Sequence, residues 1–102
     1  MNVVTTGHKY ELASFEGTDP QTLQFIEKVE IAGQPGVLQT VNDGTTNEEV
    51  LEMLIDRMKY LNGKFPCREN AIVITKLEES LMWLNKRTAD RVARAVEGKA
   101  AA

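Results

Sequence analysis

Histidine and cysteine are scarce in this 102-residue chain, which has one of each. With Cys67 as the single thiol, no disulfide can form within the chain, and a reducing compartment is the default expectation. His8, the single imidazole, lies near a terminus that we expect to be mobile, so we expect neither a Ser-His-Asp or Cys-His catalytic group nor a metal site built from histidine and cysteine. The sequence therefore predicts a binding protein without a cofactor or metal, and not an enzyme.

Long apolar runs and phosphate-binding glycine motifs are missing as well. No stretch approaches the roughly 20 apolar residues that a membrane span needs, and the start MNVVTTGHKY is not that of a secretory signal. Neither GxGxxG nor GxxxxGK[ST] occurs. The net charge of −3 argues against general affinity for nucleic acid. We expect one soluble, cytoplasmic domain over residues 1–102, bound neither to a membrane nor to nucleic acid.

The strand-rich part, residues 8–42, predicts a small antiparallel sheet. Alternating segments at 8–16, 22–31 and 37–41 are separated by the turn clusters GTDPQ and AGQPG. A sheet of about three strands is marginal alone, so we expect it to pack on helices.

Residues 46–98 predict a long antiparallel two-helix hairpin, which makes the expected fold class α+β. Thr46 followed by Glu49 is a capping-box pattern that starts a helix at residue 47, and Asn62-Gly63 is a stop signal. After a short connection, Pro66 or Cys67 opens the second helix. This helix has a seam of residues at alternating spacings of three and four: Ile74, Leu77, Leu81, Leu84, Thr88, Arg91 and Ala95.

The second helix is predicted to be much longer than the first, roughly 45 Å against 24 Å, so it overhangs beyond about residue 83. The overhang carries Arg87, Arg91 and Arg94 on one stripe. Guanidiniums donate forked hydrogen bonds to phosphate and offer flat faces to a base. The alternative is a solvated helix end in which Asp90 and Glu97 pair with the arginines.

The connection between the helices holds weaker candidates. Lys64 and Arg68 flank a helix N-terminus, which favours anions, but both also suit an ordinary exposed loop. Tyr60 can stack on a ring or simply pack, and Asn70 can read a base edge. Trp83 is expected in the hairpin core or in a subunit interface.

The amino-acid sequence of residues 42–98 resembles that of the helical-hairpin domain of phage-encoded anti-defence nucleotide sponges. The most telling pieces are PCRENA, the run from TKLEE to the Trp/Leu-rich segment, and RTADRVARAVEG. The strand-rich start, with TLQFIEKV, is similar to the branch known as Thoeris anti-defence proteins, whereas the related anti-CBASS sponges are mostly helical. The resemblance implies a non-enzymatic inhibitor in the cytoplasm of the host bacterium. Such a protein binds the glyco-cyclic ADP-ribose made by TIR-domain proteins and withholds it from its effector.

The resemblance also implies site residues and partners. The ligand-contacting positions of the family match Tyr60, Asn70, Arg87 and Arg91 of this sequence, with further candidates at Phe65, Arg68 and Arg94. Members assemble as dimers or hexamers, and several hold cyclic oligonucleotides in separate sites. Where they usually read RGVEGT this chain reads RAVEGK, so Ala95 and Lys99 argue against a second site at this terminus. A sponge for cyclic di- or trinucleotides of CBASS-type defence is the alternative within this class.

Helix length adds a deduction about the pocket. Asn70 and Arg87 are 17 positions apart on one predicted helix, roughly 25 Å along its axis. No ligand of mononucleotide size bridges that distance, so a pocket that uses both residues must lie between two antiparallel chains. A homodimer then has two symmetric pockets.

Two functions of other classes are alternatives to the sponge. One is a small phosphodiesterase or ADP-ribosyl hydrolase, for which this sequence shows no evident base or metal site. The other is a nucleic-acid-binding module.

Overall fold

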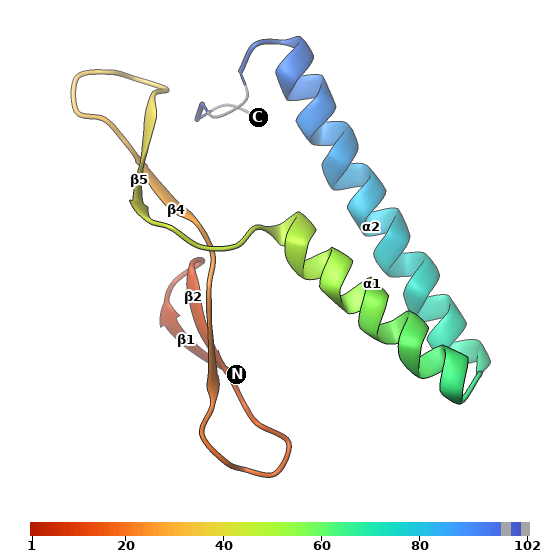
Figure 1. The fold of residues 1–102 in the computed structure, drawn as a ribbon. Coiled ribbons are helices and arrows are strands. Elements are labelled where there is room, and N and C mark those ends of the chain that lie inside the picture. The colour runs from red at the N-terminus through yellow and green to blue at the C-terminus, as the bar shows by residue number, and fades with distance from the viewer. Residues whose placement is uncertain (97–98, 101–102) are drawn as a thin grey trace. The chain divides into compact units, whose positions relative to one another are not determined.

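The computed structural model describes residues 1–96 and 99–100, which form a strand unit and a helical unit (Figure 1). The strand unit comprises residues 1–46 together with 99–100, and the helical unit extends from residue 47 to residue 96. The predicted α+β class is confirmed. The second helix ends at Ala93 and not near the predicted hairpin limit at residue 98. The expected pairing of Glu97 with arginine lies outside the described residues.

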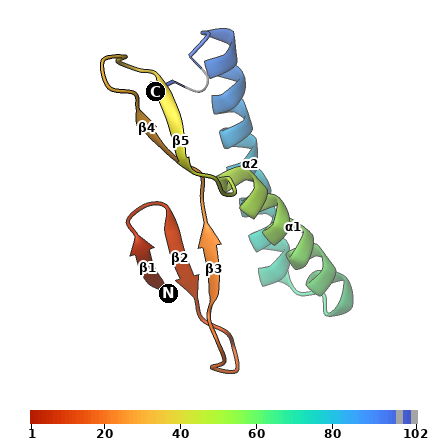
Figure 2. The same cartoon turned by 60° about the vertical axis from the view of Figure 1, so that its left-hand side comes forward.

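The strand unit contains five short antiparallel strands in two sheets, where a single sheet of about three was predicted (Figure 2). The three-stranded sheet has the order β1-β2-β3, from strands Asn2–Thr5, Lys9–Leu12 and Gln21–Gln24. The second sheet pairs strands β4 and β5, Glu27–Glu30 and Leu38–Asn42. Strand β1 was not predicted, and it places His8 in the turn that joins two paired strands.

The predicted strand over residues 22–31 is divided where the chain passes from one sheet to the other. The N–H of Phe25 donates to the His8 carbonyl at 2.7 Å, and the N–H of Ile26 donates to the Thr45 carbonyl at 2.9 Å. Gly44 is needed beside this crossing, because a Cβ there would collide with the backbone carbonyl of Gln24. The interruption therefore depends on residues distant in the sequence, which strand periodicity cannot reveal.

The helical unit is the predicted hairpin, with small differences at its ends. Helix α1, Asn47–Lys64, begins where the capping pattern predicts but continues through Gly63. Helix α2, Arg68–Ala93, begins one residue after Cys67, whose Sγ accepts a hydrogen bond from the N–H of Asn70 at 3.4 Å. No described helix is long and apolar enough to span a membrane.

The predicted seam of α2 is confirmed as far as Arg91. Its five members from Ile74 to Thr88 are half-buried and Arg91 is buried, while Ala95 lies beyond the helix and is exposed. On α1 the seam centres on Ile55, the one buried apolar side chain among the described residues. Trp83, which was expected to be in the core or an interface, is 62% exposed within this chain.

Candidate functional site

The predicted ligand-binding residues lie at opposite ends of the helical hairpin, one set at the turn between α1 and α2 and the other at the C-terminal end of α2. We call Tyr60, Lys64, Phe65, Arg68 and Asn70 the turn cluster, and Arg87, Arg91 and Arg94 the arginine end. Helix α2 is uninterrupted from Arg68 to Ala93, so these two sets do not meet within one helical unit. Roughly 25 Å of helix axis separates Asn70 from Arg87.

The turn cluster presents exposed rings beside cations. Tyr60 is 60% exposed and Phe65 is 79% exposed. The Lys64 ammonium lies over the Tyr60 ring, with its nitrogen 5.0 Å from the ring centroid, a cation–π contact. Arg68 is exposed and Asn70 is half-buried. The cluster therefore offers stacking surface, positive charge and an amide in one short segment.

Hydrogen bonds fix the backbone of the turn that carries this cluster. The side-chain oxygen of Asn62 accepts from the Cys67 N–H at 3.1 Å, and the Phe65 N–H donates to the Leu61 carbonyl at 3.0 Å. Cys67 then caps α2 through Asn70. Since the turn is held at both helix ends, the side chains of the cluster project from a defined backbone.

The arginine end is less uniform than a stripe of three equivalent side chains. Arg87 and Arg94 are exposed, whereas Arg91 is only 4% exposed. The Arg91 Nη2 donates to the carbonyl of Val96 at 3.0 Å, and its own carbonyl accepts from the Val96 N–H at 3.0 Å. Arg91 thus holds Val96 with its side chain and its backbone, a structural role that the sequence does not reveal.

The same bonds form the C-terminal cap of α2. The Ala95 N–H donates to the Val92 carbonyl at 3.0 Å, which together with the bond from Val96 to Arg91 makes a Schellman motif. Ala95 occupies the left-handed position with φ of 57°, where glycine is usual. The difference between RAVEGK and RGVEGT therefore falls on a position that favours glycine for backbone reasons.

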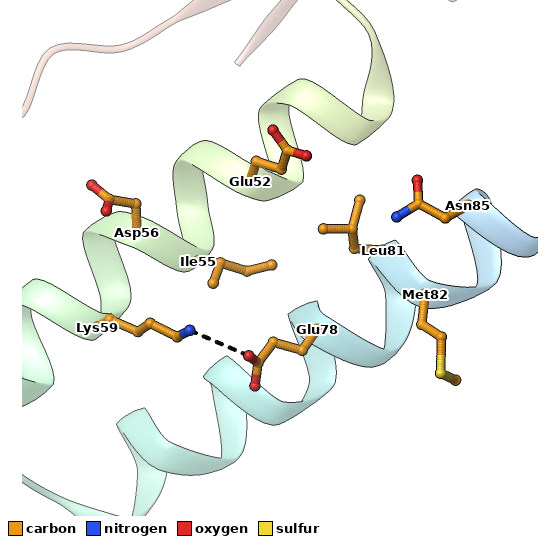
Figure 3. Close-up of a pocket in the computed structure, with 8 residues that line it drawn as sticks. All are labelled: Glu52, Ile55, Asp56, Lys59, Glu78, Leu81, Met82 and Asn85. Atoms are coloured by element: carbon orange, nitrogen blue, oxygen red, sulfur yellow. Dashed lines mark ion pairs between the residues drawn. The ribbon is translucent and has the colours of Figure 1, made fainter.

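A groove that the sequence did not indicate lies between the two helices (Figure 3). Its volume is about 560 Å³, and Ile55 and Leu81 point toward each other across it. An ion pair between Lys59 and Glu78, 3.4 Å long, lies along the same groove. The lining is Glu52, Ile55, Asp56, Lys59, Glu78, Leu81, Met82 and Asn85. With three carboxylates to one ammonium, the groove does not suit an anionic ligand.

The groove bears on the predicted extent of the hairpin. Glu52 of α1 and Asn85 of α2 line it together, so both helices flank it as far as residue 85, close to the predicted limit of about 83. Helix α2 ends at Ala93, so the part beyond the groove is shorter than predicted. Among the described residues, no group of three or more His, Cys, Asp or Glu side chains is placed to hold a metal ion.

Comparison with known proteins identifies relatives of this hairpin. Residues 26–89 match the family described as the Acb2/Tad1 hairpin domain. A protein of Bacillus phage SBSphiJ7 named "Thoeris anti-defense 1" is 49% identical over 84 residues, an alignment covering 71% of this chain. The alignment covers 59% of that phage protein, so the chain spans less than two thirds of its relative's length.

Proposed function

The chain belongs to the Acb2/Tad1 hairpin family, and from this we propose that it is an anti-defence sponge. In this proposal it binds the glyco-cyclic ADP-ribose signal of Thoeris defence without cleaving it. The signal then fails to reach its effector in the cytoplasm of the infected bacterium. The relative's name, which refers to Thoeris defence, supports this choice over a CBASS-type ligand.

The observation that carries the proposal is the chemistry of the turn cluster and of the arginine end. An exposed aromatic ring at Tyr60 and an amide at Asn70 suit a purine base. The exposed guanidinium of Arg87 suits the phosphates. The resemblance also assigns Arg91 to the ligand, although its guanidinium is 4% exposed within this chain and donates to the Val96 carbonyl. A cyclic nucleotide has little conformational freedom to lose on binding, which favours tight capture by contacts alone.

The separation of these ends leads us to propose two pockets shared between chains. In an antiparallel homodimer, the turn cluster of one protomer meets the arginine end of the other, and twofold symmetry repeats the arrangement. Exposed apolar side chains on both helices, Met53 at 57%, Met82 at 56% and Trp83 at 62%, provide surface for such an interface. A hexamer can be assembled from the same dimers.

Recovery of intact ligand tests the proposed function. The protein is incubated separately with glyco-cyclic ADP-ribose, a cyclic dinucleotide and a cyclic trinucleotide, and its melting temperature is followed. At 100 Kd of free ligand, binding stabilises the folded state by about 2.7 kcal/mol. The complex is then heat-denatured and the released nucleotide is analysed by chromatography.

We expect stabilisation by glyco-cyclic ADP-ribose and release of unchanged ligand. A chemically altered product would show an enzyme instead. Stabilisation by the cyclic di- or trinucleotide alone would assign the protein to CBASS-type signals. Absence of stabilisation by all three would contradict the sponge.

A further inference from the structure

Lys64 is placed to influence how Tyr60 receives a ligand. Both residues belong to α1 and are four positions apart, so their side chains lie on the same face of the helix. The Lys64 nitrogen is 5.0 Å from the centroid of the Tyr60 ring and covers one of its two faces. The ring is nevertheless 60% exposed, which leaves surface for another planar group.

We propose that Lys64 is a further binding residue, which directs the base of the ligand to the opposite face of Tyr60 and attracts its phosphates. This inference rests on the proposed function, because it assumes that Tyr60 stacks on the captured nucleotide. A base stacked on the open face gives the order ammonium, ring, base. The cation attracts the π electrons of the ring from one side while the base takes the other.

Distance determines how strongly the ammonium acts on the ligand. A base stacked about 3.5 Å from the ring lies roughly 8 Å from the ammonium, given the 5.0 Å on the other side. For two phosphate charges at a similar distance from the ammonium, attraction through water corresponds to about a fivefold gain in affinity at low salt. At 1 M salt the Debye length is about 3 Å, so most of the gain disappears.

Other lysines on the hairpin are engaged differently, which provides a matched control. Lys76 is an exposed lysine of α2 whose ammonium lies 3.7 Å from a carboxylate oxygen of Glu79. Lys76→Gln makes the same change in net charge as Lys64→Gln, and it leaves the Tyr60 contact in place. Lys64→Arg keeps both the charge and the ability to lie over the ring.

Calorimetric titration with glyco-cyclic ADP-ribose at about 0.02 M and 1 M salt tests the proposal. We expect Lys64→Gln to raise Kd about fivefold at low salt and less than twofold at 1 M salt. Lys64→Arg and Lys76→Gln are expected to stay within about twofold of the unmodified protein. Melting temperatures without ligand are measured for every variant, so that a folding effect is recognised.

Three results would overturn the role of Lys64 while leaving the sponge intact. The first is an unchanged Kd for Lys64→Gln at low salt. The second is an equal loss for Lys76→Gln, which would show a general charge effect. The third is tighter binding by Lys64→Gln, which would show that the lysine masks the ring. If the unmodified protein itself fails to bind, the proposed function is wrong and this inference with it.

Discussion

Arg87→Ala is expected to weaken capture of glyco-cyclic ADP-ribose by about 100-fold, with the melting temperature of the free protein unchanged. Arg87 is exposed on the solvent side of α2, and exposed helix positions of this kind contribute within about 0.5 kcal/mol to stability. In the proposed pocket, however, its guanidinium makes forked, charge-assisted hydrogen bonds to phosphate. Loss of such bonds typically costs about 1.5–3 kcal/mol each, which accounts for the expected fold-change.

The neighbouring Lys86 provides the control for this prediction. It is an exposed cation on the same turn of α2, and its ammonium pairs with Asp90 at 3.2 Å. Lys86→Ala removes one positive charge but no forked donor, so we expect its Kd to stay within about twofold. Unchanged capture by Arg87→Ala in calorimetric titration would show that the arginine end does not contact the ligand.

Arg91→Ala is expected to abolish capture and also to destabilise the protein by about 2 kcal/mol, lowering the melting temperature by roughly 10 °C. The reason for the second effect is the bond from Arg91 Nη2 to the Val96 carbonyl, made by a side chain that is 4% exposed. Removing this buried donor leaves the carbonyl without its charged partner and opens a cavity beside the helix end. Thermal unfolding and ligand titration of the same samples measure both effects.

A second substitution separates the two roles of Arg91. Ala95 has a left-handed backbone, with φ of 57°, so Ala95→Gly relieves strain and is expected to restore about 1 kcal/mol. The double variant Arg91→Ala/Ala95→Gly should regain part of the lost melting temperature and no capture. If capture returned with stability, Arg91 would act only through the helix end and would not bind the ligand.

The hairpin could be predicted from the sequence because its signals are local. The capping pattern at Thr46 and Glu49 marks the start of α1, and the seam from Ile74 to Thr88 follows from the spacing of half-buried residues along one helix. Such periodicity requires no knowledge of distant contacts. The positions of the candidate site residues along α2 follow from the same regularity, whereas their role in binding remains a prediction.

The features that sequence analysis missed depend on tertiary contacts. Strand β1 exists because Val3 pairs with Tyr10, and the crossing at Ile26 depends on Thr45. Lys99, which belongs to the strand unit, forms an isolated antiparallel bridge with Val37. None of these pairings has a periodic signal within its own segment.

At the candidate site, the burial of Arg91 near the end of α2 likewise could not be predicted from the sequence. An arginine in a helical seam suggests a surface position, because a buried guanidinium is rare. The burial of the Arg91 guanidinium is explained by the left-handed backbone of Ala95, which turns the Val96 carbonyl toward the arginine side chain. A glycine at position 95 would have marked this turn in the sequence.

The most direct test of a pocket shared between two chains is complementation by mixing two variants that are each impaired at one end of the proposed pocket. Asn70→Ala removes the amide of the turn cluster and keeps the backbone N–H that Cys67 caps, while Arg87→Ala removes the guanidinium at the other end. Equal amounts are mixed, dissociated and reassociated, and bound glyco-cyclic ADP-ribose is counted by titration. Random pairing makes half of the dimers mixed, and each mixed dimer has one intact pocket out of two.

We therefore expect the mixture to bind about one quarter of the ligand bound by the unmodified protein, with unmodified affinity, at a ligand concentration too low to fill the weakened pockets of either variant alone. Absence of binding by the mixture, with dimers reassociated, would contradict the shared pocket.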